Sequence, residues 1–156
     1  MRLPLSRRMA ACLRASASLL LRSSAKCSLP SEAQWEYACR AGGKAVTFGT
    51  GNGRVSSSNA NYKNNNRGTT PVGKYQANSL GLHDMSGNLW EWVQDKFTGY
   101  GNVGSDNPIY ERSGGDRVVR GGGWYDRSRY LRCSNRSGST PSGRNGDLGF
   151  RLRRSR

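Results

Sequence analysis

The side chains best suited to binding chemistry are concentrated in the last third of the sequence. Residues 124–147 consist almost entirely of Ser, Arg, Asn, Gly, Asp and Tyr. These residue types supply adaptable hydrogen bonds and rigid amphipathic contacts, a composition that antibody binding loops also use. We therefore expect a binding surface here, with Trp124, Leu131 and Cys133 as fixed anchors. An ordinary long surface loop is the alternative interpretation.

Histidine and cysteine, which serve most often in metal centres and covalent catalysis, are scarce. The sequence contains one histidine, His83, and four cysteines. A single histidine followed by Asp84 is more typical of a turn than of a metal centre. Cys12 and Cys27 lie in an N-terminal segment of different composition and support no function.

The composition favours a loop-rich domain held by short strands. The chain has 156 residues, enough for one core, and hydrophobic residues make up 34% of it. Its 21 glycines speak against a helix bundle. No apolar run approaches the roughly 18 to 20 residues that span a bilayer, so we expect no membrane span.

The formal charge of +15 raises the question of nucleic-acid binding. Much of this charge lies at the two ends of the chain, in residues 1–27 and 153–156. Without those ends the charge falls to about +6, an excess compatible with simple solubility. We therefore expect no dedicated nucleic-acid binding.

Residues 1–27 differ from the rest because they are rich in Arg, Ser and Ala and contain no acid. This composition is typical of a targeting peptide, and a mis-annotated start of the chain is the other explanation. Either way we expect a disordered leader without a place in the core. Residues 28–156 then form one N-terminally incomplete domain.

A helix with a clear start follows the leader. Ser31 is placed to cap its N-terminus, and Gln34 stands at the reciprocal position of a capping box. Trp35 and Ala38, three residues apart, share a buried face with Cys39. The glycines at 42–43 end this helix.

The remaining elements are short. Residues 49–71 are dominated by Gly, Asn and Ser and must be mostly loop. We expect extended or strand segments at 71–75, 89–93, 117–120 and 149–153, the last alternating apolar and basic residues. An α+β fold with small twisted antiparallel sheets fits this order best.

Four sequence blocks resemble the formylglycine-generating enzyme, or sulfatase-modifying factor, family. They are Leu-Pro-Ser-Glu-Ala-Gln-Trp-Glu-Tyr-Ala-Cys-Arg (29–40), Gly-Leu-His-Asp-Met-Ser-Gly-Asn-Leu-Trp-Glu-Trp (81–92), Val-Val-Arg-Gly-Gly-Gly-Trp (118–124) and Leu-Gly-Phe-Arg-Leu (148–152). One block alone would be weak evidence, but four in order are specific. The resemblance implies a C-type-lectin-like fold with much irregular structure, of which this chain carries the C-terminal part.

The family's oxidase chemistry depends on a pair of cysteines just after the Arg-Gly-Gly turn. Their thiolates hold copper(I), a soft ion that prefers sulfur ligands, and oxygen then converts a substrate cysteine to formylglycine. Here residues 124–130 contain no cysteine. Asp126 and Ser128 are hard oxygen ligands and cannot replace a thiolate pair. We therefore do not expect copper-dependent oxidation.

The resemblance also gives the two remaining cysteines a structural role. Some relatives join the positions of Cys39 and Cys133 by a disulfide, and this bridge favours a secreted or periplasmic location. Two buried free thiols are the alternative. A related iron centre built from three histidines is excluded because His83 stands alone.

Calcium is the cofactor that the resemblance leaves possible, because oxygen ligands from side chains and turn carbonyls suit this hard cation. Asp84, Gly87, Leu89 and Glu91 form one candidate site. A capped turn whose Glu91 pairs with an arginine is the alternative there. A second candidate site maps onto four residues of the Asn-rich loop, Asn61, Tyr62, Asn64 and Asn66. Relatives often have an acid at the position of Asn64.

Three functions remain. The first is a non-catalytic family member that binds an unidentified protein or small ligand through Trp124, Tyr125, Asp126, Arg127, Arg129 and Tyr130. The second is a formylglycine-generating oxidase. The third is a hypervariable ligand-binding protein of a diversity-generating retroelement, because such proteins share this fold and vary in this segment.

Overall fold

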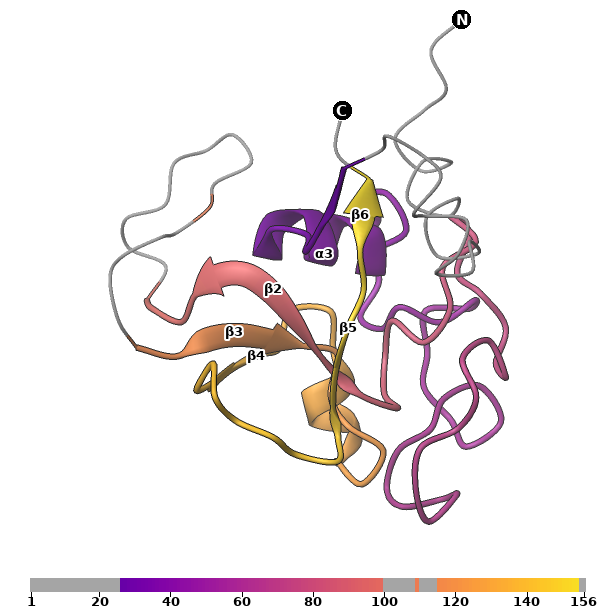
Figure 1. The fold of residues 1–156 in the computed structure, drawn as a ribbon. Coiled ribbons are helices and arrows are strands. Elements are labelled where there is room, and N and C mark those ends of the chain that lie inside the picture. Colours follow the sequence, from indigo (N-terminus) through magenta and orange to yellow (C-terminus); the bar gives the residue numbers. More distant parts are fainter. Residues whose placement is uncertain (1–25, 100–108, 110–114, 155–156) are drawn as a thin grey trace, which may run out of the picture.

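The computed structural model describes residues 26–99, 109 and 115–154. Among these residues, the helices are α3 (Glu32–Cys39) and the 3-10 helix η2 (Ser128–Leu131). The strands of the described residues are β1 (Cys27–Ser28), β2 (Trp90–Lys96), β3 (Arg117–Arg120), β4 (Arg136–Ser139), β5 (Leu148–Phe150) and β6 (Arg153–Arg154). Figure 1 shows α3 lying along a small sheet, with long irregular loops packed beside both. This arrangement confirms the α+β fold class.

The main sheet has the strand order β4-β3-β2-β5. The pairs β2–β3 and β3–β4 are antiparallel, as expected. β5 runs parallel to β2, with Leu148 opposite Trp90 and Phe150 opposite Trp92. The expectation of purely antiparallel sheets is wrong for this pair. β4 and β5 run in the same direction at opposite edges, so residues 140–147 must cross from one edge of the sheet to the other.

The predicted strand at 149–153 is divided into two. β5 ends at Phe150, and β6 pairs with β1 so that Arg154 lies opposite Cys27. The division falls at Arg151, whose side chain turns into the interior. Cys27, which the sequence assigned to the leader, thus belongs to β1, and residues 1–25 of the expected leader lie outside the described residues.

The segment at 71–75 is a turn, and its prediction as a strand is wrong. The Lys74 amide donates to the Pro71 carbonyl over 3.2 Å, and Gly73 has a φ of 83°. This positive φ suits glycine and reverses the chain, which an extended segment would not do. The loop predicted for 49–71 is confirmed, because this range holds turns and bends with an isolated bridge only at its edge, at Phe48.

The helix α3 forms as the sequence predicts. The Ser31 hydroxyl accepts from the Gln34 amide, and the Gln34 side chain accepts from the Ser31 amide, which completes the capping box. Trp35, Ala38 and Cys39 are fully buried, as expected for one shared face. Each of these outcomes depends on residues within one or two helical turns, where sequence patterns are most informative.

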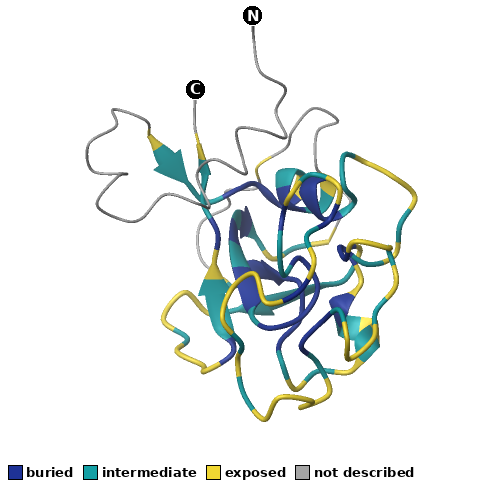
Figure 2. Cartoon of the chain, turned by 90° about the vertical axis from the view of Figure 1, so that its right-hand side faces the viewer, coloured by how far each residue is buried: buried dark blue, intermediate teal, exposed yellow. Residues whose placement is uncertain are grey.

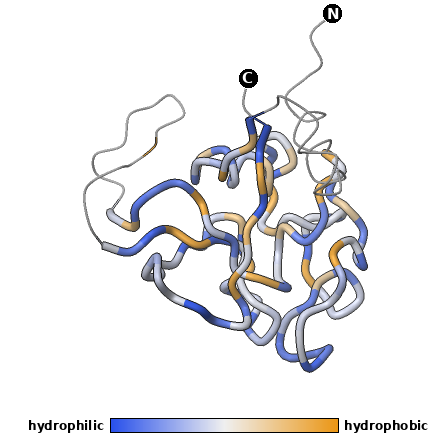
Figure 3. Tube along the Cα trace, in the orientation of Figure 1, coloured by the Kyte–Doolittle hydropathy of each residue, from blue (hydrophilic) through white to orange (hydrophobic). Residues whose placement is uncertain are grey.

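The core lies between α3 and the sheet, and Figure 2 shows buried residues gathered there. Short hydrophobic stretches lie in β3 and β5, whereas most of β2 and much of the outer loops are hydrophilic (Figure 3). The expected disulfide joins Cys39 at the end of α3 to Cys133 beyond η2. The buried core cluster consists of Trp35, Ala38, Cys39, Leu82, Met85, Val93, Val118 and Cys133.

An ion-pair network between α3 and the sheet was not predicted. Arg120 on β3 is fully buried and pairs with Glu36, and its Nε lies 3.4 Å from Glu32. Arg136 on β4 also pairs with Glu32, at 2.5 Å. The i, i+4 spacing of the two glutamates was the available signal, because it places both carboxylates on one helix face.

Among the described residues, the helices are all too short or too polar to cross a bilayer.

Candidate functional site

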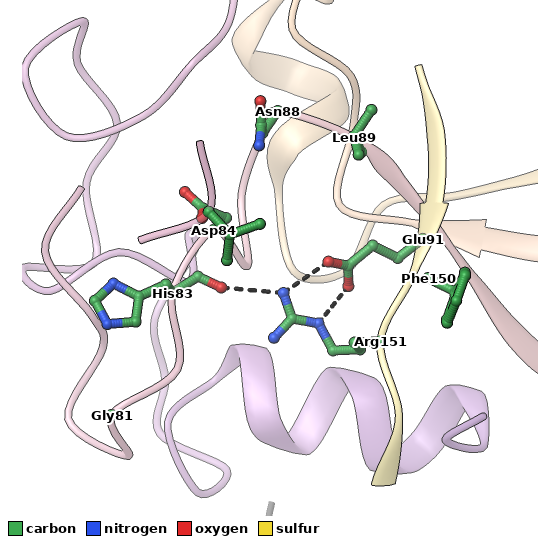
Figure 4. A pocket seen from close by; sticks show the side chains of 10 residues that line it. Gly81, His83, Asp84, Asn88, Leu89, Glu91, Phe150 and Arg151 are labelled. Carbon is green, nitrogen blue, oxygen red and sulfur yellow. Dashed lines mark hydrogen bonds and ion pairs between the residues drawn. The ribbon is translucent and has the colours of Figure 1, made fainter. Parts of the chain in front are cut away.

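A cavity of about 340 Å³ opens beside the turn that precedes β2. The turn supplies His83, Asp84 and Leu89, β2 supplies Glu91, and the chain at the end of β5 supplies Arg151 (Figure 4). Val72 and Phe150, both largely exposed, form its apolar border. The cavity therefore combines an apolar mouth with charged groups in its wall.

The turn owes its shape to residues that tolerate a left-handed backbone. Asp84, Gly87 and Asn88 have φ values of 55°, 93° and 70°, a region that Gly, Asn and Asp enter most easily. A Cβ on Gly87 would lie 2.4 Å from the carbonyl oxygen of Asn61. The Asn88 side chain accepts from the Thr70 amide over 2.8 Å. These contacts hold the turn against the neighbouring Asn-rich loop, residues 61–70.

Glu91 is the acceptor for two buried donors. Its carboxylate accepts from Nη2 of Arg151 over 2.6 Å and from Nε1 of Trp35 over 2.7 Å. Arg151 also donates to the carbonyl of His83 over 3.0 Å. Burial lowers the pKa of Arg151, but the charge and hydrogen bonds of Glu91 outweigh it and raise that pKa. The alternative interpretation of this site, in which Glu91 pairs with an arginine, is therefore confirmed.

The first set of predicted calcium ligands lies together at this cavity. Asp84, Gly87, Leu89 and Glu91 all line it. One carboxylate oxygen of Asp84 accepts from the Gly73 amide over 2.8 Å. Burial raises the pKa of Asp84 above its ordinary value, and the Gly73 hydrogen bond opposes this effect. An all-oxygen set of two carboxylates and two carbonyls matches the chemistry of calcium.

The second predicted set lies in one tight loop. Nδ2 of Asn66 donates to Oδ1 of Asn61 over 3.0 Å, so these two side chains meet. Nζ of Lys74 donates to Oδ1 of Asn66 over 2.9 Å. The carbonyls of Tyr62 and Asn64 accept from amides within the loop. The loop is thus closed by its own hydrogen bonds, with an ammonium group already at one of the candidate oxygens.

The predicted binding segment, residues 124–130, is anchored at its start by Asp126. Oδ2 of Asp126 accepts from Nε1 of Trp90 over 2.7 Å and from the Gly123 amide over 2.9 Å. This carboxylate oxygen therefore holds the segment to the sheet. Leu131, fully buried, anchors the other end, and its carbonyl accepts from the Ser86 hydroxyl.

Aromatic and basic side chains project from the anchored segment. Tyr125 is 52% exposed, and its hydroxyl donates to Asp147 over 2.8 Å. This hydrogen bond raises the pKa of Tyr125 to about 12. The rings of Trp124 and Tyr125 meet edge to face, with centroids 5.1 Å apart. The Arg129 guanidinium lies 4.7 Å from the centroid of the Tyr130 ring.

Sequence patterns did not predict that the Asn-rich loop lies beside this segment. The Lys63 amide donates to the Asp126 carbonyl, and the Asn64 amide donates to the Trp124 carbonyl, each over 2.9 Å. Both residues of the loop are in left-handed conformations. Such pairing between irregular segments leaves no periodic signal in the sequence.

The sequence matches the sulfatase-modifying factor enzyme 1-like domain over residues 10–156. The chain belongs to this family. The mouse formylglycine-generating enzyme is 36% identical to this family member over 141 residues, which cover 79% of the chain and 38% of the mouse protein. The serine/threonine-protein kinase Pkn1 of Chlamydia trachomatis is 39% identical over 127 residues, which cover 79% of the chain and 20% of that kinase.

A solved structure that is similar to this chain agrees with the architecture. Variable protein 1 of Treponema denticola superposes with a TM-score of 0.71 and 32% sequence identity, covering 81% of the chain and 46% of that protein. The chain spans less than half the length of each of these three proteins.

Proposed function

We propose that this sulfatase-modifying factor domain binds a ligand or protein partner through residues 124–130 and does not oxidise cysteine through copper. The observation that carries the proposal is the content of this segment, where the family resemblance expects copper-binding thiolates. It holds Tyr, Arg, Ser and Asp instead. Oxygen and guanidinium groups do not bind copper(I) as a thiolate pair does.

The anchoring of the segment supports a binding role. Asp126 fixes one end to Trp90, and Leu131 fixes the other end in the core. Tyr125 keeps half of its surface exposed while its hydroxyl is held by Asp147. An exposed ring that is already oriented loses little conformational entropy when a ligand covers it.

Binding to an immobilised panel of glycans and peptides tests this role. The double variant Tyr125→Ala/Arg129→Ala should lose binding while its unfolding curve stays close to wild type. Tyr37→Ala/Arg154→Ala is the matched control, since both of its side chains are exposed elsewhere on the domain. The proposal is wrong if the two double variants bind every probe as the wild type does.

Formylglycine formation is the competing function, because the mouse relative is named for it. The purified domain should be incubated with copper(I), oxygen and a cysteine-containing sulfatase peptide. We expect the peptide mass to stay unchanged. Formation of the aldehyde product would establish an oxidase and overturn the non-catalytic part of the proposal.

A hypervariable ligand-binding protein is the second candidate, favoured by the likeness to the variable protein of Treponema denticola. The test lies in the surrounding DNA. A nearby near-copy of the codons for residues 124–147, differing mainly at adenines, would support this candidate. Absence of such a copy would remove it and leave a fixed binding segment.

Calcium at the Asp84 site is a further part of the proposal. Asp84 and Glu91 would supply carboxylates, while Gly87 and Leu89 would supply carbonyls. Arg151 already neutralises one of the two carboxylates, so we expect weak affinity, because calcium affinity rises with ligand charge. Calcium bound there would tie the turn to β2.

Thermal unfolding with calcium and with a chelator tests that site. Calcium should raise the midpoint of the wild type and leave that of Asp84→Asn unchanged. Asparagine keeps an acceptor for the Gly73 amide and tolerates the positive φ of this position. An equal calcium response in both proteins would place the ion elsewhere.

The disulfide supports an oxidising location, secreted or periplasmic. Protein isolated from its native cells with thiols blocked should carry the Cys39–Cys133 bond. Recovery of both cysteines as free, alkylated thiols would argue for a reducing compartment.

A further inference from the structure

Two segments that are distant in the sequence form one exposed surface. The backbone of Lys63 and Asn64 is hydrogen-bonded to that of Asp126 and Trp124, so the Asn-rich loop lies alongside the binding segment. We call this the basic–aromatic surface. It consists of Tyr62, Lys63, Arg67, Arg127, Arg129 and Tyr130, of which the two tyrosines are half-buried.

The exposed charges of this surface have one sign. Lys63, Arg67, Arg127 and Arg129 are all exposed. The single acid within residues 61–67 and 124–130 is Asp126, and one of its oxygens is held by Trp90 and Gly123. A surface with four exposed cations and one committed carboxylate produces a positive potential that attracts anions.

Aromatic rings are interleaved with these cations. The Arg129 guanidinium lies over the Tyr130 ring and donates to its hydroxyl over 2.9 Å. Nζ of Lys63 lies 5.8 Å from the centroid of the Tyr62 ring. Such contacts hold each cation beside a flat apolar face. A ligand can then meet a charge and a ring at the same place.

We propose that the ligand of this surface is an anionic carbohydrate, one that carries sulfate or carboxylate groups. The inference rests on the proposed function, whose binding segment forms part of the surface. A guanidinium presents its donors as a planar fork that fits sulfate and carboxylate oxygens. The tyrosine rings suit the apolar face of a sugar ring.

The alternatives fit these observations less well. An acidic peptide would satisfy the cations but not require rings beside them. A neutral glycan would use the rings but leave four exposed cations without a role. Double-stranded nucleic acid needs a long run of phosphate contacts, whereas this surface offers a short cluster.

Affinity measurements with defined probes test the proposal. The probes are a heparin-derived sulfated oligosaccharide, its desulfated counterpart, and poly-glutamate of matched charge. We expect the sulfated oligosaccharide to bind at least tenfold more tightly than either of the others, and its binding to weaken with salt. If poly-glutamate binds equally well, the surface binds anions without selectivity, and the carbohydrate assignment is wrong.

Charge variants locate the binding. Arg127→Gln/Arg129→Gln should weaken binding of the sulfated oligosaccharide about tenfold. Lys44→Gln/Arg154→Gln removes the same charge from exposed positions outside the surface and should change binding less than about twofold. Equal losses would show that only net charge matters and would overturn the proposal. Binding of neutral probes alone through residues 124–130 would refute the anionic ligand and leave the proposed function standing.

Discussion

Removal of the Cys39–Cys133 disulfide is the sharpest perturbation of stability that this fold offers. Both cysteines are fully buried, and the bond joins positions 94 residues apart in the sequence. It ties the end of α3 to the chain just beyond η2, and so to the anchored end of the binding segment. The double variant Cys39→Ala/Cys133→Ala removes the bond without leaving a lone thiol.

The expected cost follows from the size of the closed loop. In the chain-entropy model, removing a cross-link that closes a loop of this length lowers the free energy of unfolding by about 4 to 5 kcal/mol. The small cavities left by two sulfur atoms add to this cost. A typical domain has a free energy of unfolding of about 5 to 15 kcal/mol, so the variant should lose a third or more of its stability.

Urea denaturation provides the assay. The wild type in reducing buffer is the internal control, because reduction removes the same bond without changing a residue. Both samples should show a much lower midpoint than the oxidised wild type, with the variant at or below the reduced protein. A loss below about 1 kcal/mol in both samples would refute the loop-closure reasoning.

Three further substitutions test the site. Glu91→Gln should lower the free energy of unfolding by about 3 to 5 kcal/mol, because it removes the charged partner that is hydrogen-bonded to the buried Arg151. A loss below about 1 kcal/mol in urea denaturation would show that the pair is dispensable. Gly87→Ala should cost more than about 2 kcal/mol by the same assay, since its Cβ would collide with a backbone oxygen; wild-type stability would contradict the turn geometry. Tyr125→Phe should remove one tyrosine that ionises at about pH 12 from the ultraviolet titration. Because the hydrogen bond to Asp147 raises this pKa in the folded protein, its contribution to stability is present below pH 10 and is lost as pH rises through 12. Ionisation of Tyr125 near pH 10 would refute the role of this hydrogen bond.

A pH dependence follows from Asp84. Because burial raises its pKa in the folded protein, the folded state holds this proton more tightly than the unfolded chain does. Metal-free protein should therefore lose stability as pH rises from the ordinary pKa of 3.8 through the raised value. Asp84→Asn should flatten this part of the stability curve. An unchanged pH profile would show that Asp84 is not the group responsible.

The elements that depend on neighbouring residues could be predicted from the sequence. The capping box of Ser31 and Gln34 and the buried face of Trp35 are decided within the helix itself. The Arg-Gly-Gly turn named with the family resemblance also forms, directly after β3, with Gly121 and Gly122 at positive φ. The disulfide came from the family resemblance, since no local pattern relates Cys39 to Cys133.

The features that depend on distant parts of the chain were missed. The parallel pairing of β5 with β2 results from the path of residues 140–147 across the sheet, which composition does not encode. Arg151 was expected inside one strand of alternating apolar and basic residues, but β5 ends before it and its side chain pairs with Glu91 in the interior. Asp126 was expected on the binding surface, yet one of its oxygens is used by Trp90 inside the fold.

Chemical-shift mapping by NMR tests the central claim most directly. The domain would be titrated with the probe that binds most tightly in the panel of glycans and peptides. We predict that the largest amide shifts fall in residues 124–130 and in the adjacent Asn-rich loop. Shifts confined to the cavity around Asp84 and Glu91 would contradict the assignment of residues 124–130 as the binding segment.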